Sequence, residues 1–349
     1  MVGILVALWS VGQGSRDTGI ERPGPLTALT VTPGPLPTPT PRPARATEPT
    51  APQPGVVGLF VEPDDGRAPI LDELNAARRS IDLEIYLLSD EEILQALERA
   101  QARGVRVRVI LEEHPFGGAG GEERVFARLE QAGIAVRWSN PAFRLSHIKT
   151  FVIDAEVAII MNLNLTKTSF TGNREFGAIT TRPAEVAQAD AIFEADWQRS
   201  AEPPDGPLVV SPTTSRRTLL GLIESATTSL DIYAEVVRDE EIVAALEQAA
   251  SRDVVVRLIV SNDSEENDRG REERARLADQ GVQVRLARGL YIHAKMVLVD
   301  GNRAYVGSQN FTTASLDLNR ELGILLDDRI TIARLARTFE ADFNEGREE

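Results

Sequence analysis

The sequence has no cysteine, and lysine and histidine are scarce. Its 349 residues include three lysines and three histidines, against 35 arginines. The absence of cysteine excludes disulfides, thiolate metal sites and a cysteine nucleophile. Three histidines leave little room for a histidine-rich metal cluster, so we expect a protein that uses neither a metal nor another cofactor.

An excess of positive charge is also missing. The chain carries 38 basic and 53 acidic side chains, for a formal charge of −15. Proteins that coat nucleic acid neutralise phosphates with many lysines and arginines, so this balance argues against such a protein. At roughly 150 residues per domain the length predicts two domains, and an apolar content of 42% is enough for their cores.

Residues 1–55 differ in composition from the rest of the chain. They contain 11 of the 20 prolines, many beside threonine, which predicts a disordered linker without a core. The apolar run 2–9 lies ahead of this linker and is too short to span a bilayer. It is similar to the centre of a secretory signal, although no positive charge precedes it. We therefore expect a secreted or cell-envelope protein, with a cytoplasmic protein as the alternative.

From residue 56 onward the chain repeats itself. The segments 80–86 and 229–235 are similar and lie 149 residues apart. Each copy alternates short β-branched stretches with amphipathic stretches that favour helices. Such alternation predicts α/β halves, in which helices cover the faces of sheets. The predicted domains are 1–55, 56–203 and 204–349, with the boundary between the halves in the turn-rich stretch 203–207.

The scarce histidines and lysines recur at one spacing. His147 precedes Lys149 by two residues, and His293 precedes Lys295 by two residues, 146 positions further along. Chance rarely places two of three histidines and two of three lysines in one duplicated motif. Residues two apart on a strand point to the same side, so each histidine projects with its lysine. Other pairs at the same spacing are Asp154 and Asp300, Asn164 and Asn310, and Glu175 and Glu321.

This pattern suits chemistry at a phosphodiester. If the halves pack face to face, two ammonium groups can neutralise the charge that develops on phosphate. One imidazole can attack phosphorus while the other protonates the leaving oxygen. A carboxylate beside each imidazole would fix its tautomer, and amides would donate hydrogen bonds to phosphate oxygens. The sequence therefore predicts covalent phosphodiester chemistry without a metal.

The motif H-x-K-x4-D followed by G-S-x-N resembles the signature of the phospholipase D superfamily. The second copy fits fully, with Gly307 and Ser308, whereas the first carries Met161 and Asn162 at these positions. The resemblance covers about residues 56–349. It implies two α/β/α sandwich halves with mixed sheets about a pseudo-twofold axis, and one active site between them. The departure in the first copy predicts hindered backbone approach there and tighter phosphate contact from the second half.

The resemblance also implies roles for the repeated residues. A phosphohistidine would form on His147, His293 would act as the acid, and water or an alcohol would resolve the intermediate. Glu175 and Glu321 resemble the family carboxylate that hydrogen-bonds a catalytic histidine, and the residues alone leave open which glutamate serves which histidine. The predicted catalytic residues are His147, Lys149, His293, Lys295, Glu175 and Glu321, and the predicted phosphate-binding residues are Asn164, Asn310, Ser308 and Asn162.

For Asp154 and Asp300 we predict a structural role. Each lies at the opposite parity to its histidine along the strand, so its side chain points elsewhere. Asp300 also precedes a glycine in a hairpin turn signal. Two alternatives stay open for the other residues: the asparagines as turn formers, and the glutamates as partners of the arginines that precede them.

A site common to a whole superfamily does not identify the substrate. The apolar segments 141–145 and 288–292, each with an arginine, suit an amphiphile at a membrane surface, so we predict phospholipase D-type hydrolysis of phospholipid headgroups. One alternative is a nuclease for single-stranded nucleic acid, which the acidic charge disfavours. A cardiolipin synthase-like phosphatidyl transferase and an inactive phosphate- or lipid-binding module are the others. Because one chain carries both motifs, we expect an active monomer.

Overall fold

The structure is a computed structural model, and it describes most of the chain beyond the N-terminal segment. Residues 1–54 and 56 of the predicted linker and residues 203–205 of the predicted boundary lie outside the described residues. The described residues are 55, 57–116, 121–200, 206–262 and 270–348.

The first sheet is mixed and contains strands from residues 57–180. Its order is β1-β7-β6-β5-β2-β3-β4, in which β2, β3 and β4 pair in parallel and the other neighbours are antiparallel. A parallel core extended by antiparallel strands fits a chain that alternates helical crossovers with hairpins. The strands are β1 (Val57–Glu62), β2 (Ser80–Ile85), β3 (Arg106–Leu111), β4 (Ala135–Trp138), β5 (Lys149–Ile153), β6 (Val157–Met161) and β7 (Asn173–Thr180).

The second sheet repeats the first. Its order is β16-β11-β10-β9-β13-β14-β15-β8, so β8, β15, β14, β13, β9, β10 and β11 correspond to β1, β7, β6, β5, β2, β3 and β4. The predicted pair of mixed α/β halves is therefore confirmed. The strands are β8 (Val209–Ser211), β9 (Ser229–Tyr233), β10 (Val255–Val260), β11 (Gln283–Leu286), β13 (Met296–Val299), β14 (Arg303–Gly307), β15 (Glu321–Leu326) and β16 (Arg347–Glu348).

Helices of corresponding kind connect the strands in the two halves. At the start of α2 and of α7 an aspartate caps the helix: Asp90 accepts a hydrogen bond from the backbone of Ile93, and Asp239 from that of Ile242. The helices are α1 (Ala68–Ala76), α2 (Glu91–Ala102), α3 (Glu122–Gln131), α4 (Lys167–Thr171), α5 (Pro183–Gln198), α6 (Ser215–Glu224), α7 (Glu240–Ser251), α8 (Arg271–Asp279), α9 (Thr313–Asp317) and α10 (Arg329–Glu345). Among the described residues, none of these helices has both the length and the apolar character needed to cross a bilayer.

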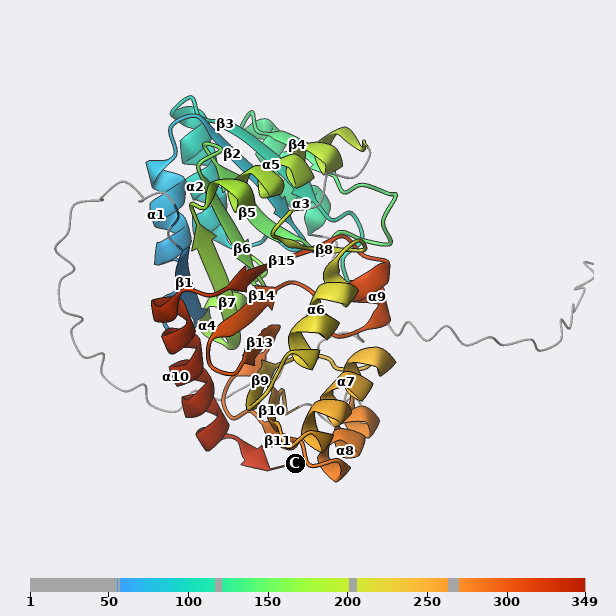
Figure 1. The fold of residues 1–349 in the computed structure, drawn as a ribbon. Helices are drawn as coiled ribbons and strands as arrows, with labels where there is room; N and C mark the ends of the chain where they lie inside the picture. The colour runs from blue at the N-terminus through green and yellow to red at the C-terminus, as the bar shows by residue number, and fades with distance from the viewer. Residues whose placement is uncertain (1–54, 56, 117–120, 201–205, 263–269, 349) are drawn as a thin grey trace, which may run out of the picture.

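The two halves share one apolar core. Each half has its own cluster between its sheet and its first helices, and a third cluster joins both sheets. This shared core includes Ile160 and Phe176 of the first sheet, Val306 and Ile324 of the second, and Phe339 of α10. In Figure 1, α10 runs along both halves, from β1 to the end of the chain beside β11. Burial on both sides of the interface therefore fixes how the halves sit against each other.

Short stretches of chain cross between the halves just before each motif histidine. The two-residue strand β12 (Tyr291–Ile292) pairs in parallel with β7 of the first half. Before the first motif, Ser146 forms a parallel bridge with Arg320 of the second half. Each histidine is thus delivered next to the strand of the other half that carries a predicted glutamate.

Candidate active site

Both histidine–lysine pairs lie at the start of a central strand. His147 comes just before β5, and His293 just before β13. The two histidines are 9% and 8% exposed, and Lys149 and Lys295 are fully buried. In each pair the lysine Nζ donates to the carbonyl oxygen of its own histidine, at 2.8 Å in the first half and 2.6 Å in the second. This contact holds both side chains on one side of the strand.

Each histidine is hydrogen-bonded to the glutamate of the opposite half. His147 Nδ1 lies 2.9 Å from Glu321 Oε2, and His293 Nδ1 lies 2.7 Å from Glu175 Oε2. Both glutamates are fully buried. The structure thus brings the six predicted catalytic residues into one site between the halves. A hydrogen bond at Nδ1 leaves Nε2 as the ring nitrogen that can meet a substrate.

An asparagine two positions earlier supports each glutamate. Asn173 Nδ2 donates to Glu175 Oε1 at 3.0 Å, and Asn319 Nδ2 donates to Glu321 Oε1 at 3.1 Å. The second carboxylate oxygen is thereby occupied, so each carboxylate keeps one orientation toward its histidine. The sequence analysis did not assign this role, although both asparagines recur at the spacing of 146.

Burial of the first-half site favours a neutral histidine. Burial lowers the pKa of His147 to about 4, although Glu321 opposes the shift. Burial opposes ionisation of Glu321, but His147 and Lys149 lower its pKa, so the carboxylate is charged. His147 therefore donates a hydrogen bond from Nδ1–H to Glu321 and keeps a free electron pair on Nε2. Burial also lowers the pKa of Lys149 to about 7, and the charge of Lys295 adds to this effect.

The second half has an additional carboxylate, which the sequence analysis missed. Glu235 follows β9, and its Oε2 accepts a hydrogen bond from Lys295 Nζ at 2.6 Å. The same oxygen lies 3.6 Å from His293 Nε2, and the Tyr291 hydroxyl donates to Oε1 at 3.2 Å. Burial would raise the pKa of Glu235, but Lys295 and His293 outweigh burial and lower it.

The corresponding position in the first half is Tyr86, which explains why Glu235 was missed. Glu235 has no duplicate, and duplication was the signal that identified the other residues. Tyr86 places its ring 4.8 Å below Lys149 Nζ and meets the His147 ring edge-on at 4.6 Å between centroids. Among the described residues Lys149 forms no ion pair, whereas Lys295 does. The two lysines therefore differ in charge environment, and the tighter phosphate contact expected from the second half stays a prediction.

Packing accounts for Met161 in the first motif, where the second motif has Gly307. In the second half, a side chain at Gly307 would overlap the hydroxyl of Tyr305. The corresponding residues of the first half are Ile159 and Met161, and both are fully buried in the core of that half. The smaller Ile159 leaves room that Met161 fills. Met161 is part of this buried core, and the predicted hindrance to a ligand there stays a prediction.

The predicted phosphate-binding residues divide into two kinds. Asn162 Oδ1 accepts a hydrogen bond from the backbone of Phe176 at 2.7 Å, and Ser308 Oγ accepts one from the backbone of Leu322 at 3.1 Å. Both side chains therefore join neighbouring strands, which leaves the Ser308 hydroxyl proton and the Asn162 amide for a ligand. The amides of Asn164 and Asn310 differ, because their buried Oδ1 atoms have no hydrogen-bond partner among the described residues.

Asp154 and Asp300 lie at the far ends of β5 and β13 from the histidines. Both have φ in the left-handed region, at 55° and 49°. Each carboxylate accepts hydrogen bonds from three backbone N–H groups, two just before and one at the start of the first parallel strand of its half. The donors are Arg78, Arg79 and Ser80 for Asp154, and Thr227, Thr228 and Ser229 for Asp300.

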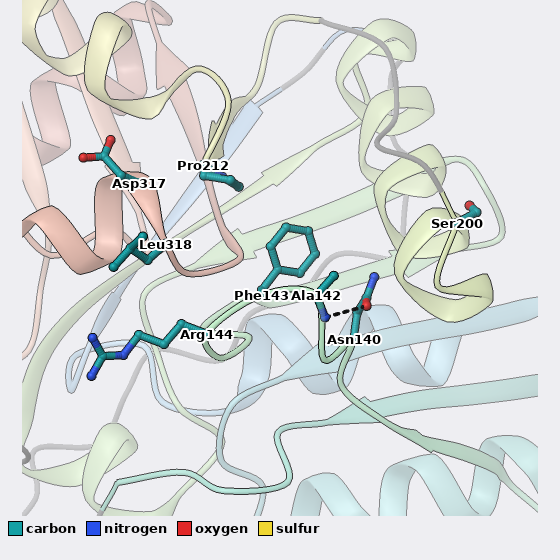
Figure 2. Close-up of a pocket in the computed structure, with 8 residues that line it drawn as sticks. All are labelled: Asn140, Ala142, Phe143, Arg144, Ser200, Pro212, Asp317 and Leu318. Atoms are coloured by element: carbon teal, nitrogen blue, oxygen red, sulfur yellow. Dashed lines mark hydrogen bonds between the residues drawn. The ribbon is translucent and has the colours of Figure 1, made fainter.

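A partly apolar pocket of about 720 Å³ is lined in part by the segments that lead to His147 and to Glu321. Phe143 lines it from the segment that leads to His147, and Leu318 lines it from the segment that leads to Glu321. Figure 2 shows Phe143 and Leu318 on the same hollow, with Arg144 extending away from the Phe143 ring. Leu318 is 46% exposed, so its side chain is accessible from solvent. The described residues contain no group of three or more side chains that could hold a metal ion.

Comparisons with known proteins agree with this geometry. Residues 70–197 and 219–343 match a family model described as "Cardiolipin synthase, PLD-like domain". A cardiolipin synthase of Geobacillus kaustophilus is 27% identical over 320 residues, covering 78% of this chain and 63% of that protein. A mitochondrial cardiolipin hydrolase of Chlamydomonas reinhardtii is 28% identical over 127 residues, covering 36% of this chain and 55% of that protein. This chain therefore spans less than two thirds of the length of these relatives.

One solved structure of similar size shows the same fold. The phosphatidylserine synthase of Haemophilus influenzae gives a TM-score of 0.66 at 13% sequence identity. The match covers 84% of this chain and 87% of that one. At such low identity the likeness concerns the fold alone.

Proposed function

Since the chain belongs to the phospholipase D-like family of the matched model, we propose that it is a phosphatidyl transferase of the cardiolipin synthase type. The names of its relatives support transfer better than the hydrolysis that the sequence analysis favoured. The observation that carries the proposal is the crossed pairing of His147 with Glu321 and of His293 with Glu175. It supplies two imidazoles with different environments in one site.

In the first step His147 attacks the phosphorus of a phospholipid headgroup diester. Its neutral ring presents the Nε2 electron pair while Nδ1–H donates to Glu321. The Nε2–P bond forms and the bond from phosphorus to the headgroup oxygen breaks. His293 has a carboxylate opposite each ring nitrogen, which suits the ring that delivers a proton to that oxygen.

In the second step an alcohol takes the phosphatidyl group. Its proton moves to Nε2 of His293, its oxygen bonds to phosphorus, and the bond to His147 breaks. Lys149 and Lys295 balance the charge on the phosphate oxygens in both steps, and the amides of Asn164 and Asn310 are proposed as further donors. Water in place of the alcohol would give hydrolysis through the same intermediate.

An amphiphilic substrate fits the surroundings of the site. The pocket lined by Phe143 and Leu318 offers an apolar surface to acyl chains, and Arg144 also lines it. We therefore propose action at a membrane surface. One chain supplies both halves of the site, which supports an active monomer. A location in the cell envelope stays a prediction.

The test is the product formed from vesicles of phosphatidylglycerol with EDTA present. Transfer yields cardiolipin and glycerol, and His147→Ala and His293→Ala should each abolish the products. Mass spectrometry of acid-quenched enzyme should place the phosphoryl adduct on His147, and an adduct on His293 would reverse the roles. Phosphatidic acid as the sole lipid product would show that the protein is a hydrolase, as the sequence analysis predicted. Cleavage of single-stranded DNA with lipids untouched would favour the nuclease, and inactivity toward both would leave a binding module.

A further inference from the structure

The duplicated site is asymmetric at one position that faces the substrate. Tyr86 and Glu235 occupy the same place in the two halves, 149 residues apart. Tyr86 contacts the His147 ring and the Lys149 ammonium of the first motif, whereas Glu235 binds Lys295 and approaches Nε2 of His293. Nε2 of His293 is the atom that exchanges a proton with the departing and arriving alcohols. A carboxylate is thus fixed beside the alcohol oxygen.

This carboxylate suits a hydroxyl better than a phosphate. An ionised carboxylate only accepts hydrogen bonds, so it binds O–H donors and repels phosphate oxygens. Its pairing with Lys295 at 2.6 Å also offsets the positive charge on this side, while Lys149 stays available on the other. The Glu235 side chain is 20% exposed and its partner Tyr291 is 37% exposed, so this edge of the site is open to an entering molecule.

We propose that Glu235 forms an acceptor subsite that selects alcohols with two adjacent hydroxyl groups. The inference rests on the proposed transferase function. One hydroxyl lies at Nε2 of His293 and is the one that reacts, and its neighbour donates a hydrogen bond to Glu235. A vicinal diol, such as the glycerol headgroup of a phospholipid or free glycerol, satisfies both contacts. A simple alcohol satisfies one.

The reaction balances without a further reactant. The bond between phosphorus and His147 Nε2 breaks, and a bond from phosphorus to the reacting oxygen forms. The proton of that hydroxyl moves to His293, which lost a proton to the leaving group in the first step. The second hydroxyl stays intact and only donates to Glu235. Glu235 thus acts as a specificity-determining residue rather than as the base.

The experiment is a competition between two acceptors. Full-length protein reacts with phosphatidylcholine vesicles in equal concentrations of glycerol and 1-propanol, and the ratio of phosphatidylglycerol to phosphatidylpropanol is measured. We expect wild type to favour glycerol and Glu235→Gln to lower the ratio about tenfold, the worth of one hydrogen bond to a charged group. The apparent KM for glycerol should rise while the KM for the lipid stays constant. Glu240→Gln is the matched control, because this glutamate is 75% exposed and pairs with Arg276.

An unchanged ratio in Glu235→Gln would overturn the inference. If the KM for the lipid falls at the same time, Glu235 is instead a competitor of the phosphate. A parallel assay with bis(p-nitrophenyl) phosphate reads the same acceptor ratio without lipid recognition. If the protein turns over this diester but not the lipid, a phospholipid is not its donor. A tenfold lower ratio of glycerol product to propanol product in Glu235→Gln would still support the acceptor subsite. Inactivity of wild type toward both donors and toward phosphatidylglycerol vesicles would overturn both proposals.

Discussion

The hydrogen bond from His147 Nδ1 to Glu321 Oε2 joins residues that lie 174 positions apart in the chain. Its counterpart joins His293 to Glu175 in the opposite direction. Each half therefore supplies the imidazole of one pair and the carboxylate of the other. The chemistry of each histidine depends on the strand pairing between the halves.

Replacing either glutamate should slow a different chemical step. Glu321→Gln removes the charge that orients His147, so formation of the phosphoenzyme should slow by about 10²- to 10⁴-fold, as for the acid of a catalytic triad. Glu175→Gln acts on His293 and should slow departure of the headgroup most for substrates with poor leaving groups. Single-turnover quench experiments with alkyl and p-nitrophenyl leaving groups separate the two effects. Equal sensitivity of both variants to the leaving group would contradict this assignment.

Activity should follow a bell-shaped pH profile set by the first half. The pKa of His147 is lowered to about 4, so kcat/KM should rise as the ring loses its proton near this pH. The pKa of Lys149 is lowered to about 7, so kcat/KM should fall above this pH as the ammonium that binds phosphate is lost. Bound phosphate favours the charged lysine, so the alkaline limb of kcat should lie at higher pH than that of kcat/KM. Coincident limbs would show that another group controls them. If Lys149 controls the alkaline limb of kcat/KM, Lys149→Arg should remove that limb.

Restoring the family motif in the first half should damage the protein. Met161 is fully buried in the core of its half, so Met161→Gly leaves a cavity and should lower the free energy of unfolding by about 2–5 kcal/mol. Urea denaturation measures the loss. Met161→Leu keeps the volume and should cost less than about 1.5 kcal/mol. Higher kcat/KM in a stable Met161→Gly protein would show that the side chain hinders the ligand after all.

Asp300 should contribute to stability only when it is ionised. Burial opposes ionisation, but the hydrogen bonds from Ser229 and Thr228 lower its pKa below the usual 3.8. A lowered folded pKa gives stability that is present above the unfolded value and is lost as pH falls through the folded value. Asp300→Ala should therefore cost about 1–3 kcal/mol at pH 7 and progressively less in acid. Asp279→Ala, at an exposed helix end, is the control. An equal loss at pH 7 and pH 2 would contradict the charge-based account.

The sequence allowed prediction of which residues meet, because both motifs repeat at one spacing. It did not allow prediction of how they pair, since the crossing of Ser146 to Arg320 and of β12 to β7 depends on strand order in space. The family resemblance and the mixed α/β fold are confirmed. Glu235 was not predicted as a site residue because its counterpart in the first half is Tyr86, so the duplication did not reveal it. The packing of Met161 was not predicted, because the accompanying change, Tyr305 against Ile159, lies two positions away on the same strand.

The crossed strands also affect the protein while it is being made. The ribosome completes His147, Lys149 and Glu175 well before Glu321, Lys295 and His293 emerge. A nascent or truncated chain therefore has an imidazole with neither its orienting carboxylate nor its proton donor. Under the proposed function, chemistry would start only after the last sheet docks on the first. The polypeptide would thus stay inert toward phospholipids until its synthesis and folding are finished.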